Sequence, residues 1–161
     1  MTQHEPAVIV ETRMEVRIAA APDAVWEALT EDIGAWWPDE FYAGGQSGRR
    51  SYRLEARPGG RMYEEWDDGG GLLWGSVVSA QPGVALHVTG TLFPEWGGPS
   101  VWFGTWRIEP EGDGAVLAFC EHTFGRVTEA QLAEKEKGWR FLLDGALRAH
   151  LEGREQPRWA E

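Results

Sequence analysis

The chain has 161 residues, of which 42% are hydrophobic and 25% charged, and its formal net charge is −11. This size and composition predict one globular domain over residues 1–161, with its core at about 11–152 and frayed termini. The acidic balance argues against nucleic acid and against anionic membranes as partners, because both attract clustered positive charge. No apolar run is long enough to span a membrane and no signal-peptide pattern occurs, so we expect a cytoplasmic protein.

Signals for metal binding and for nucleophilic catalysis are weak. The lone cysteine, Cys120, excludes an internal disulfide and a cysteine-rich zinc site. The four histidines, His4, His87, His122 and His150, lack the spacing of helical metal ligands. There is no GxSxG motif and no phosphate-binding loop. We therefore expect neither a metal nor a cofactor.

The first third of the chain predicts a strand followed by one or two short helices. Residues 11–18 alternate strictly between apolar and charged side chains, which is typical of a strand with one buried face. The next segment, 22–37, carries apolar residues at helical spacing behind Pro22, which suits the first helical position. Pro38 predicts the end of this helical region, because it disfavours a helical conformation at Trp37.

The remainder predicts a series of strands and then a long helix. Apolar and β-branched runs are separated by glycine, proline and aspartate clusters, as in an antiparallel meander; they cover 51–57, 61–66, 72–79, 84–90, 101–109 and 115–123. Residues 128–152 form an amphipathic helix, with Thr128 as its N-cap. Among the arginines, Arg49, Arg53 and Arg57 share strand parity, and we expect them in solvent on the outer face. The element order predicts an α+β fold, in which a twisted antiparallel sheet carries its helices on one face.

Four segments give the sequence a family resemblance: APDAVWEALTEDIGAWW, RPGGRMYEEWDDGG, WGSVVSAQPGVAL and GWRFLLDGALRAHLE. Their order resembles the START-like helix-grip (SRPBCC) superfamily, in its bacterial branch similar to the activator of heat-shock-protein ATPase. The resemblance implies a curved sheet of six to seven strands around a long C-terminal helix, with an apolar ligand pocket between them. It does not imply one activity, because the superfamily includes lipid carriers, hormone receptors and polyketide cyclases.

The strand at 101–109 offers two interpretations. Trp102, Gly104 and Trp106 share one face, which we expect to turn towards the helix. The glycine leaves a notch between two indoles. The two rings either form part of a solid aromatic core or flank a slot for a ligand, and the second interpretation follows from the hollow of a helix-grip sheet.

The strand at 115–123 has two possible registers. One turns Leu117, Phe119 and Glu121 inward, and a slip of one residue turns the other face inward. The resemblance favours the first, which aims the Glu121 carboxylate at the pocket as an acid/base group or a ligand anchor. An exposed Glu121, or one paired with an arginine, remains the alternative. The same two interpretations, a carboxylate aimed at the pocket or an exposed or paired side chain, apply to Glu64, which shares a strand face with Trp66.

The sequence AWWPDEF places two tryptophans where the helical region ends. We expect Trp36 to pack in the core, and Trp37 and Phe41 to form a gate over the pocket mouth. Trp96, in the connection FPEWGGP, is the candidate for the opposite lip.

The leading hypothesis is a binding or carrier protein, rather than an enzyme, for a small hydrophobic ligand that is aromatic or polycyclic. The expected ligand-binding residues are Trp37, Phe41, Trp66, Trp102, Trp106, Glu121, Trp139 and Leu143. The first alternative is a cyclase- or hydratase-type enzyme with Glu121 as general base, assisted by His122 or Glu64. The second is a co-chaperone-like interaction module. The chain is expected to be a monomer or a homodimer.

Overall fold

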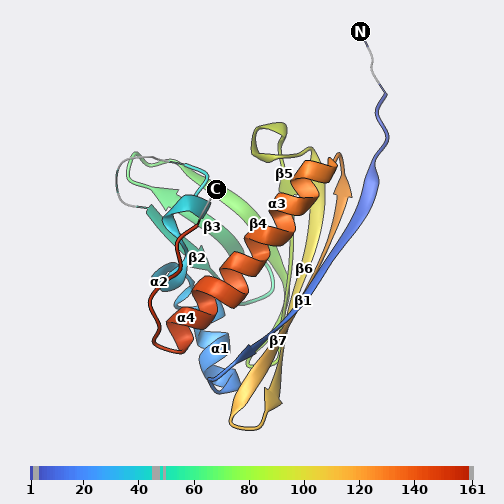
Figure 1. Ribbon diagram of the computed structural model, residues 1–161. Coiled ribbons are helices and arrows are strands. Elements are labelled where there is room, and N and C mark those ends of the chain that lie inside the picture. The colour runs from blue at the N-terminus through green and yellow to red at the C-terminus, as the bar shows by residue number, and fades with distance from the viewer. Residues whose placement is uncertain (2–3, 45–47, 49, 160–161) are drawn as a thin grey trace.

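A single antiparallel sheet of seven strands forms the body of the protein (Figure 1). The computed structural model describes residues 1, 4–44, 48 and 50–159. The strand order is β1-β7-β6-β5-β4-β3-β2. The strands are β1 (Val8–Ile18), β2 (Arg50–Leu54), β3 (Arg61–Trp66), β4 (Gly71–Gln81), β5 (Ala85–Leu92), β6 (Ser100–Glu111) and β7 (Gly114–Gly125). The helices lie on the concave side of this bent sheet, which confirms the predicted helix-grip α+β fold.

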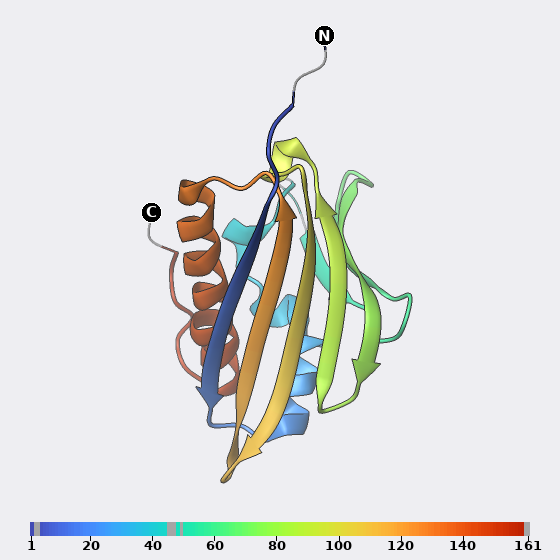
Figure 2. The same cartoon turned by 90° about the vertical axis from the view of Figure 1, so that its right-hand side faces the viewer.

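Strand β1 shows how the sequence pattern sets the two faces. Thr12, Met14, Val16 and Ile18 are buried, whereas the glutamate and arginine residues between them are exposed. Successive side chains of a strand point to opposite faces, so strict alternation separates core from solvent. Figure 2 shows β1 at the edge of the sheet beside β7. At the opposite edge of the sheet, Arg53 of β2 and Arg57 in the connection after it are exposed, as expected. Arg49 lies outside the described residues.

The helical region after β1 is divided into three short pieces, α1 (Pro22–Leu29), α2 (Ile33–Trp36) and the 3-10 turn η1 (Asp39–Phe41). α1 ends at Thr30, whose hydroxyl donates to the carbonyl of Trp26 at 2.8 Å. The buried Trp36 donates its indole N–H to the carbonyl of Ala28 at 2.7 Å and so ties α2 to α1. Trp37 is extended, as expected for a residue before proline.

The C-terminal helix runs across the concave face as three consecutive segments, α3 (Glu129–Arg140), the π-helical η3 (Phe141–Leu147) and α4 (Arg148–Leu151). Thr128 caps it in a reciprocal capping box with Gln131. Leu142, Leu143 and Leu147 are buried against the sheet. None of the helices in the described part of the chain is both long enough and apolar enough to cross a membrane.

The segment after α4 packs against this helix, whereas we expected a frayed end. The Trp159 ring meets Phe141 edge-on at 5.0 Å and Phe41 at 5.1 Å between ring centroids. Gln156 donates to the carbonyl of Ala146 at 3.3 Å. Aromatic area at the chain end therefore anchors residues that are otherwise polar. Within the N-terminal segment that we also expected to fray, residues 2–3 lie outside the described residues.

Candidate functional site

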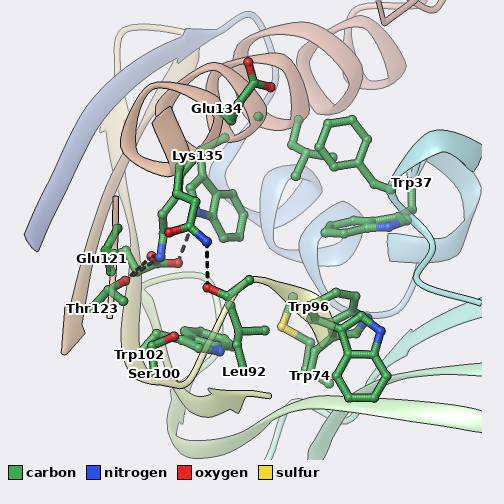
Figure 3. A pocket seen from close by; sticks show the side chains of 18 of the residues that line it. Trp37, Trp74, Leu92, Trp96, Ser100, Trp102, Glu121, Thr123, Glu134 and Lys135 are labelled. Carbon is green, nitrogen blue, oxygen red and sulfur yellow. Dashed lines mark hydrogen bonds and ion pairs between the residues drawn. The ribbon is translucent and has the colours of Figure 1, made fainter. Parts of the chain in front are cut away.

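A pocket of about 400 Å³ lies between the concave face of the sheet and α3 (Figure 3). Its wall is mainly aromatic, with Trp37, Phe41, Tyr52, Trp74, Trp96, Trp102 and Trp139. Polar side chains gather on one side, where Ser100, Glu121, Thr123, Gln131, Glu134 and Lys135 line it. The pocket therefore combines a broad apolar surface with a localised polar region.

The floor of the pocket is the indole of Trp102, which lies over glycines of three neighbouring strands. A Cβ at Gly75 of β4 would stand 3.0 Å from the indole, and one at Gly90 of β5 only 2.6 Å. At Gly104 of β6 the distance would be 3.1 Å. Real Cβ atoms essentially never come as close as 2.6 Å to another heavy atom and rarely as close as 3.0–3.1 Å, so the glycines let a large ring lie flat on the sheet. This arrangement keeps Trp102 low and leaves the hollow above it open.

The notch at Gly104 is filled, so it is not an open slot for a ligand. A Cβ there would also stand 2.8 Å from the Trp106 ring. Trp106 is buried and packs against Phe119 and Trp139, at centroid distances of 5.1 and 5.8 Å. It is absent from the described lining of the pocket. Of the two tryptophans flanking the glycine, one lines the pocket and the other belongs to the core.

Trp37 forms the wall where the chain leaves α2. Its ring is stacked on Tyr52, with centroids 3.9 Å apart and planes at 17°. Burial and the nearby charge of Glu64 raise the pKa of Tyr52 well above its usual value, so this ring stays neutral. The indole N–H of Trp37 is buried and has no hydrogen-bond partner among the described residues. Trp37 therefore presents a rigidly supported aromatic surface with an unused donor.

Phe41 is held firmly beside the same end of the pocket. It stacks on Phe141 at 5.6 Å and meets Trp159 edge-on. A Cβ at Gly138 of α3 would stand 3.4 Å from the Phe41 ring, so the ring lies directly against the helix at this position. Movement of Phe41 would therefore involve the C-terminal segment as well as η1.

Trp96 lies across the pocket in the loop after β5, at the end of the 3-10 turn η2 (Pro94–Trp96) (Figure 3). It is 39% exposed, and its ring meets Phe93 edge-on at 6.2 Å. Gln131 of α3 donates to the carbonyl of Gly97 at 3.1 Å. This bond joins the Trp96 loop to the helix.

Glu121 forms the centre of the polar side. Lys135 reaches from α3 to form an ion pair with its carboxylate and also donates to the Thr123 hydroxyl (Figure 3). Thr123 donates to Glu121 at 3.0 Å, and the Trp139 indole N–H donates at 3.1 Å. The carboxylate is 3% exposed. A buried charge needs such partners, and here three donors from β7 and α3 supply them.

Glu64 is a second buried carboxylate on the concave face, at 1% exposure. It accepts hydrogen bonds from the Trp66 and Trp74 indoles at 2.6 and 3.0 Å. The backbone N–H groups of Ala43 and Gly44 donate to it as well, each at 3.0 Å. Glu64 thus fixes Trp74, which lines the pocket, and the loop that follows Tyr42.

The structure brings five of the expected site residues to the pocket and leaves the others elsewhere. Trp37, Phe41, Trp102, Glu121 and Trp139 line it. Leu143 is buried in the core, like Trp106. Trp66 belongs to the Glu64 cluster and is absent from the lining described for the pocket.

The expected assistance of Glu121 by His122 is not possible in this fold. β7 adopts the register in which Leu117, Phe119 and Glu121 face inward. His122 therefore projects from the outer face and pairs with Glu11 of β1. Because neighbouring strand residues point to opposite faces, the imidazole and the Glu121 carboxylate lie on opposite sides of the sheet.

Sequence reasoning missed Trp74 and Lys135. Lys135 precedes Trp139 by four residues, so helical spacing places it on the same face of α3. That spacing could have identified it as the partner of Glu121. Trp74 follows a run of glycines and is the extra residue at a bulge in β4, opposite Met62 and Tyr63 of β3, where strand parity is a poor guide.

Comparison with solved structures supports the fold. A protein from Rhizobium leguminosarum is 22% identical with a TM-score of 0.69, covering 92% of this chain and 98% of that one. Aha1 from Colwellia psychrerythraea, whose solution structure is a dimer, is 17% identical with a TM-score of 0.61 and coverages of 89% and 96%. DynU16, a protein of the dynemicin biosynthetic locus, is 20% identical with a TM-score of 0.65 and coverages of 89% and 48%.

A comparison with curated proteins gives no match. The family model described as "Activator of Hsp90 ATPase homolog 1-like protein" matches residues 19–152. These limits include α1, the sheet from β2 to β7 and the whole C-terminal helix. The chain therefore belongs to the Activator of Hsp90 ATPase homolog 1-like family.

Proposed function

We propose that this protein binds a small, largely apolar aromatic ligand between the sheet and α3. The observation that supports this most directly is the pocket of about 400 Å³ with indole rings on its floor and walls. Its size falls within the range of small-molecule sites. Large flat rings bury extensive apolar area at little entropic cost, and they favour ligands that are flat themselves.

The polar region gives this ligand a preferred orientation. Lys135, Thr123 and Glu121 lie together on one side, whereas Trp37 and Trp74 lie on another (Figure 3). A ligand with rings and one hydrogen-bonding substituent would place its rings on the indoles and its substituent beside Lys135. This division between contact area and a few polar groups is common in ligand pockets.

The binding function is better supported than general-base catalysis. Both oxygens of Glu121 already accept hydrogen bonds, and Lys135 neutralises its charge. A base in this position would first have to leave the ion pair. Turnover of a bound ligand that is lost in Glu121→Gln would overturn this preference.

The test is a titration with 2-naphthol followed by tryptophan fluorescence and calorimetry. We expect saturable binding with one site, and an affinity at least 10-fold weaker in the double variant Trp37→Ala/Phe41→Ala. Phe103→Ala is the matched control, because Phe103 is 53% exposed on the outer face. Equal binding by the double variant and the wild type would contradict the proposal. It would also be contradicted if the wild type bound no flat aromatic compound in a panel that includes 1-anilinonaphthalene-8-sulfonate.

A further inference from the structure

Three side chains that commonly bind metals meet on the outer face of the sheet, away from the pocket. Cys120 and His122 project from β7, and Glu11 of β1 lies directly opposite His122 in the strand register. One ligand atom from each side chain lies within 4.8 Å of the other two. Glu121, between the cysteine and the histidine, points into the pocket. One stretch of β7 thus serves both faces of the sheet.

The distances distinguish the roles of these three groups. The Cys120 Sγ atom lies 3.8 Å from His122 Nδ1, and His122 Nε2 lies 2.8 Å from a Glu11 carboxylate oxygen. Zinc forms bonds of about 2.3 Å to sulfur and about 2.0 Å to nitrogen, so one ion spanning the 3.8 Å gap would have an S–metal–N angle of about 120°. This angle is close to tetrahedral geometry. Little rearrangement of the two side chains is needed.

Glu11 orients the imidazole from the other side. When Nε2 carries the proton and donates it to Glu11, the lone pair of Nδ1 points towards Cys120. Histidines that bind metals commonly donate their second N–H to a carboxylate in this way. Glu11 is also bonded to Arg13, which favours its remaining in this orienting position rather than moving to the metal.

We propose that Cys120 and His122 form a surface site for a thiophilic divalent transition metal ion such as Zn²⁺. The Cys120 thiolate and His122 Nδ1 are the protein ligands, Glu11 is the positioning residue, and water completes the coordination sphere. On binding, the thiol proton is released to solvent and a metal–sulfur bond forms. A thiolate ligand discriminates against Mg²⁺ and Ca²⁺. The site is independent of the proposed function.

The surroundings suit a modest affinity. The side chains of His122 and Glu11 are 46% and 41% exposed, so water reaches the open coordination positions. Arg13, opposite Cys120 in the register, is a positive charge that opposes the cation. Phe103 is the register neighbour of His122 on β6, so an apolar residue flanks the site on that side. The site should therefore bind a metal reversibly.

The test is a titration of the reduced protein with Co²⁺, monitored through the thiolate-to-cobalt charge-transfer absorption in the near ultraviolet. We expect this band to saturate at one equivalent and to be removed by competing Zn²⁺. Cys120→Ser should abolish the band, and His122→Ala should weaken binding at least 10-fold. Glu11→Gln should weaken binding 10-fold or more without removing the band.

Two substitutions control for general effects of charge and of histidine loss. Glu15→Gln removes a carboxylate from the same exposed face of β1, and His4→Ala removes an exposed histidine. Both should bind Co²⁺ as the wild type does, with circular dichroism confirming that every variant is folded. The proposal is wrong if the wild type gives no charge-transfer band, if Cys120→Ser retains it, or if His122→Ala binds with unchanged affinity. None of these outcomes bears on ligand binding in the pocket.

Discussion

Glu64 and Glu121 are both buried carboxylates on the concave face of the sheet, but different groups stabilise them. Glu121 is paired with the positive charge of Lys135. Glu64 is surrounded by N–H donors, two from indoles and two from the backbone, and within the described residues no cation pairs with it. One carboxylate lines the pocket, whereas the other lies behind the wall that Trp74 forms.

The two carboxylates differ in what surrounds them: Glu64 holds a loop and an indole in place, whereas Glu121 lies in the lining of the pocket beside a lysine. The donors to Glu64 come from the loop after Tyr42 and from the paired strands β3 and β4, so the carboxylate ties that loop to the sheet. Two of these donors are backbone N–H groups, and their bonds cannot be exchanged without moving the main chain. The Lys135 side chain, by contrast, is flexible and 19% exposed, so it can turn towards a ligand. We therefore expect substitutions around Glu64 to affect stability most, and substitutions around Glu121 to affect binding as well.

Glu64→Gln should have the largest effect. The amide oxygen can replace the carboxylate oxygen that accepts from Ala43, Gly44 and Trp66, but the amide NH2 group then faces the Trp74 N–H donor. The remaining hydrogen bonds also lose their charge assistance, so we expect a loss of about 4 kcal/mol in the free energy of unfolding. Urea denaturation measures this loss. Glu65→Gln is the control, because Glu65 faces the exposed side of the same strand. A loss at Glu64 that does not exceed that of the control would refute a structural role for this carboxylate.

Lys135→Met should come next. It leaves the Glu121 carboxylate buried without its cation, and we expect destabilisation by about 3 kcal/mol. Adding Glu121→Gln to this variant should recover much of the loss, because the uncompensated charge is then removed. Urea denaturation of the two single variants and the double variant forms a thermodynamic cycle. Additive losses would show that the pair does not interact.

The third prediction compares the replacement of an indole beside Glu64 with the replacement of an indole beside Glu121. Trp74→Phe removes one N–H from Glu64, and Trp139→Phe removes one from Glu121. We expect losses of about 2 and about 1 kcal/mol, because Lys135 still neutralises Glu121 after its hydrogen bond is lost. Thermal and urea unfolding measure both losses in stability and show which of the two is larger. The reverse order would indicate that the cation contributes less than the indole.

Glu55, a partly exposed carboxylate, should show the smallest effect on stability of the residues compared. Hydrogen bonds from Arg61 lower the pKa of Glu55 from 4.5 to about 2. Its folded-state pKa is below the unfolded value, so the stabilisation is complete above pH 4.5 and is lost as the pH falls towards 2. The difference in stability between wild type and Glu55→Gln should therefore be small at pH 7 and vanish by about pH 2. A pH-independent difference in urea unfolding would contradict this assignment.

The fold was predictable because its signals are periodic. The alternation in β1, the turn residues between strands and the helical stripe after Thr128 each identify an element without long-range information. The register of β7 needed the family resemblance, because both of its faces carry apolar residues. The packing of Trp159 was missed because the polar residues before it look like those of a free tail.

The site was predictable only in part, because a lining residue is defined by what lies opposite it. Trp102 and Trp106 share a strand face, yet one lines the pocket and the other is covered by Phe119 and Trp139. Strand parity cannot separate them. The outer face, on which charged side chains were expected, also carries the exposed apolar side chains of Ile9, Phe103 and Phe124. The alternation of burial continues through β7 and β6, but the outward-facing residues of the three strands include apolar side chains as well as charged ones.

The glycines beneath Trp102 let its ring lie close to the main chain. The depth of the pocket is therefore set by the main chain and not by the side chains that a ligand would touch. At Gly90, a methyl group would also collide with the carbonyl oxygen of Trp74, so that position tolerates no added carbon. At Gly104 the three nearest contacts are with the Trp106 and Trp102 rings. We expect Gly104→Ala to displace these rings and so to make the pocket shallower. Gly104 is absent from the described lining of the pocket, so such a change in depth would come from a residue beneath the lining.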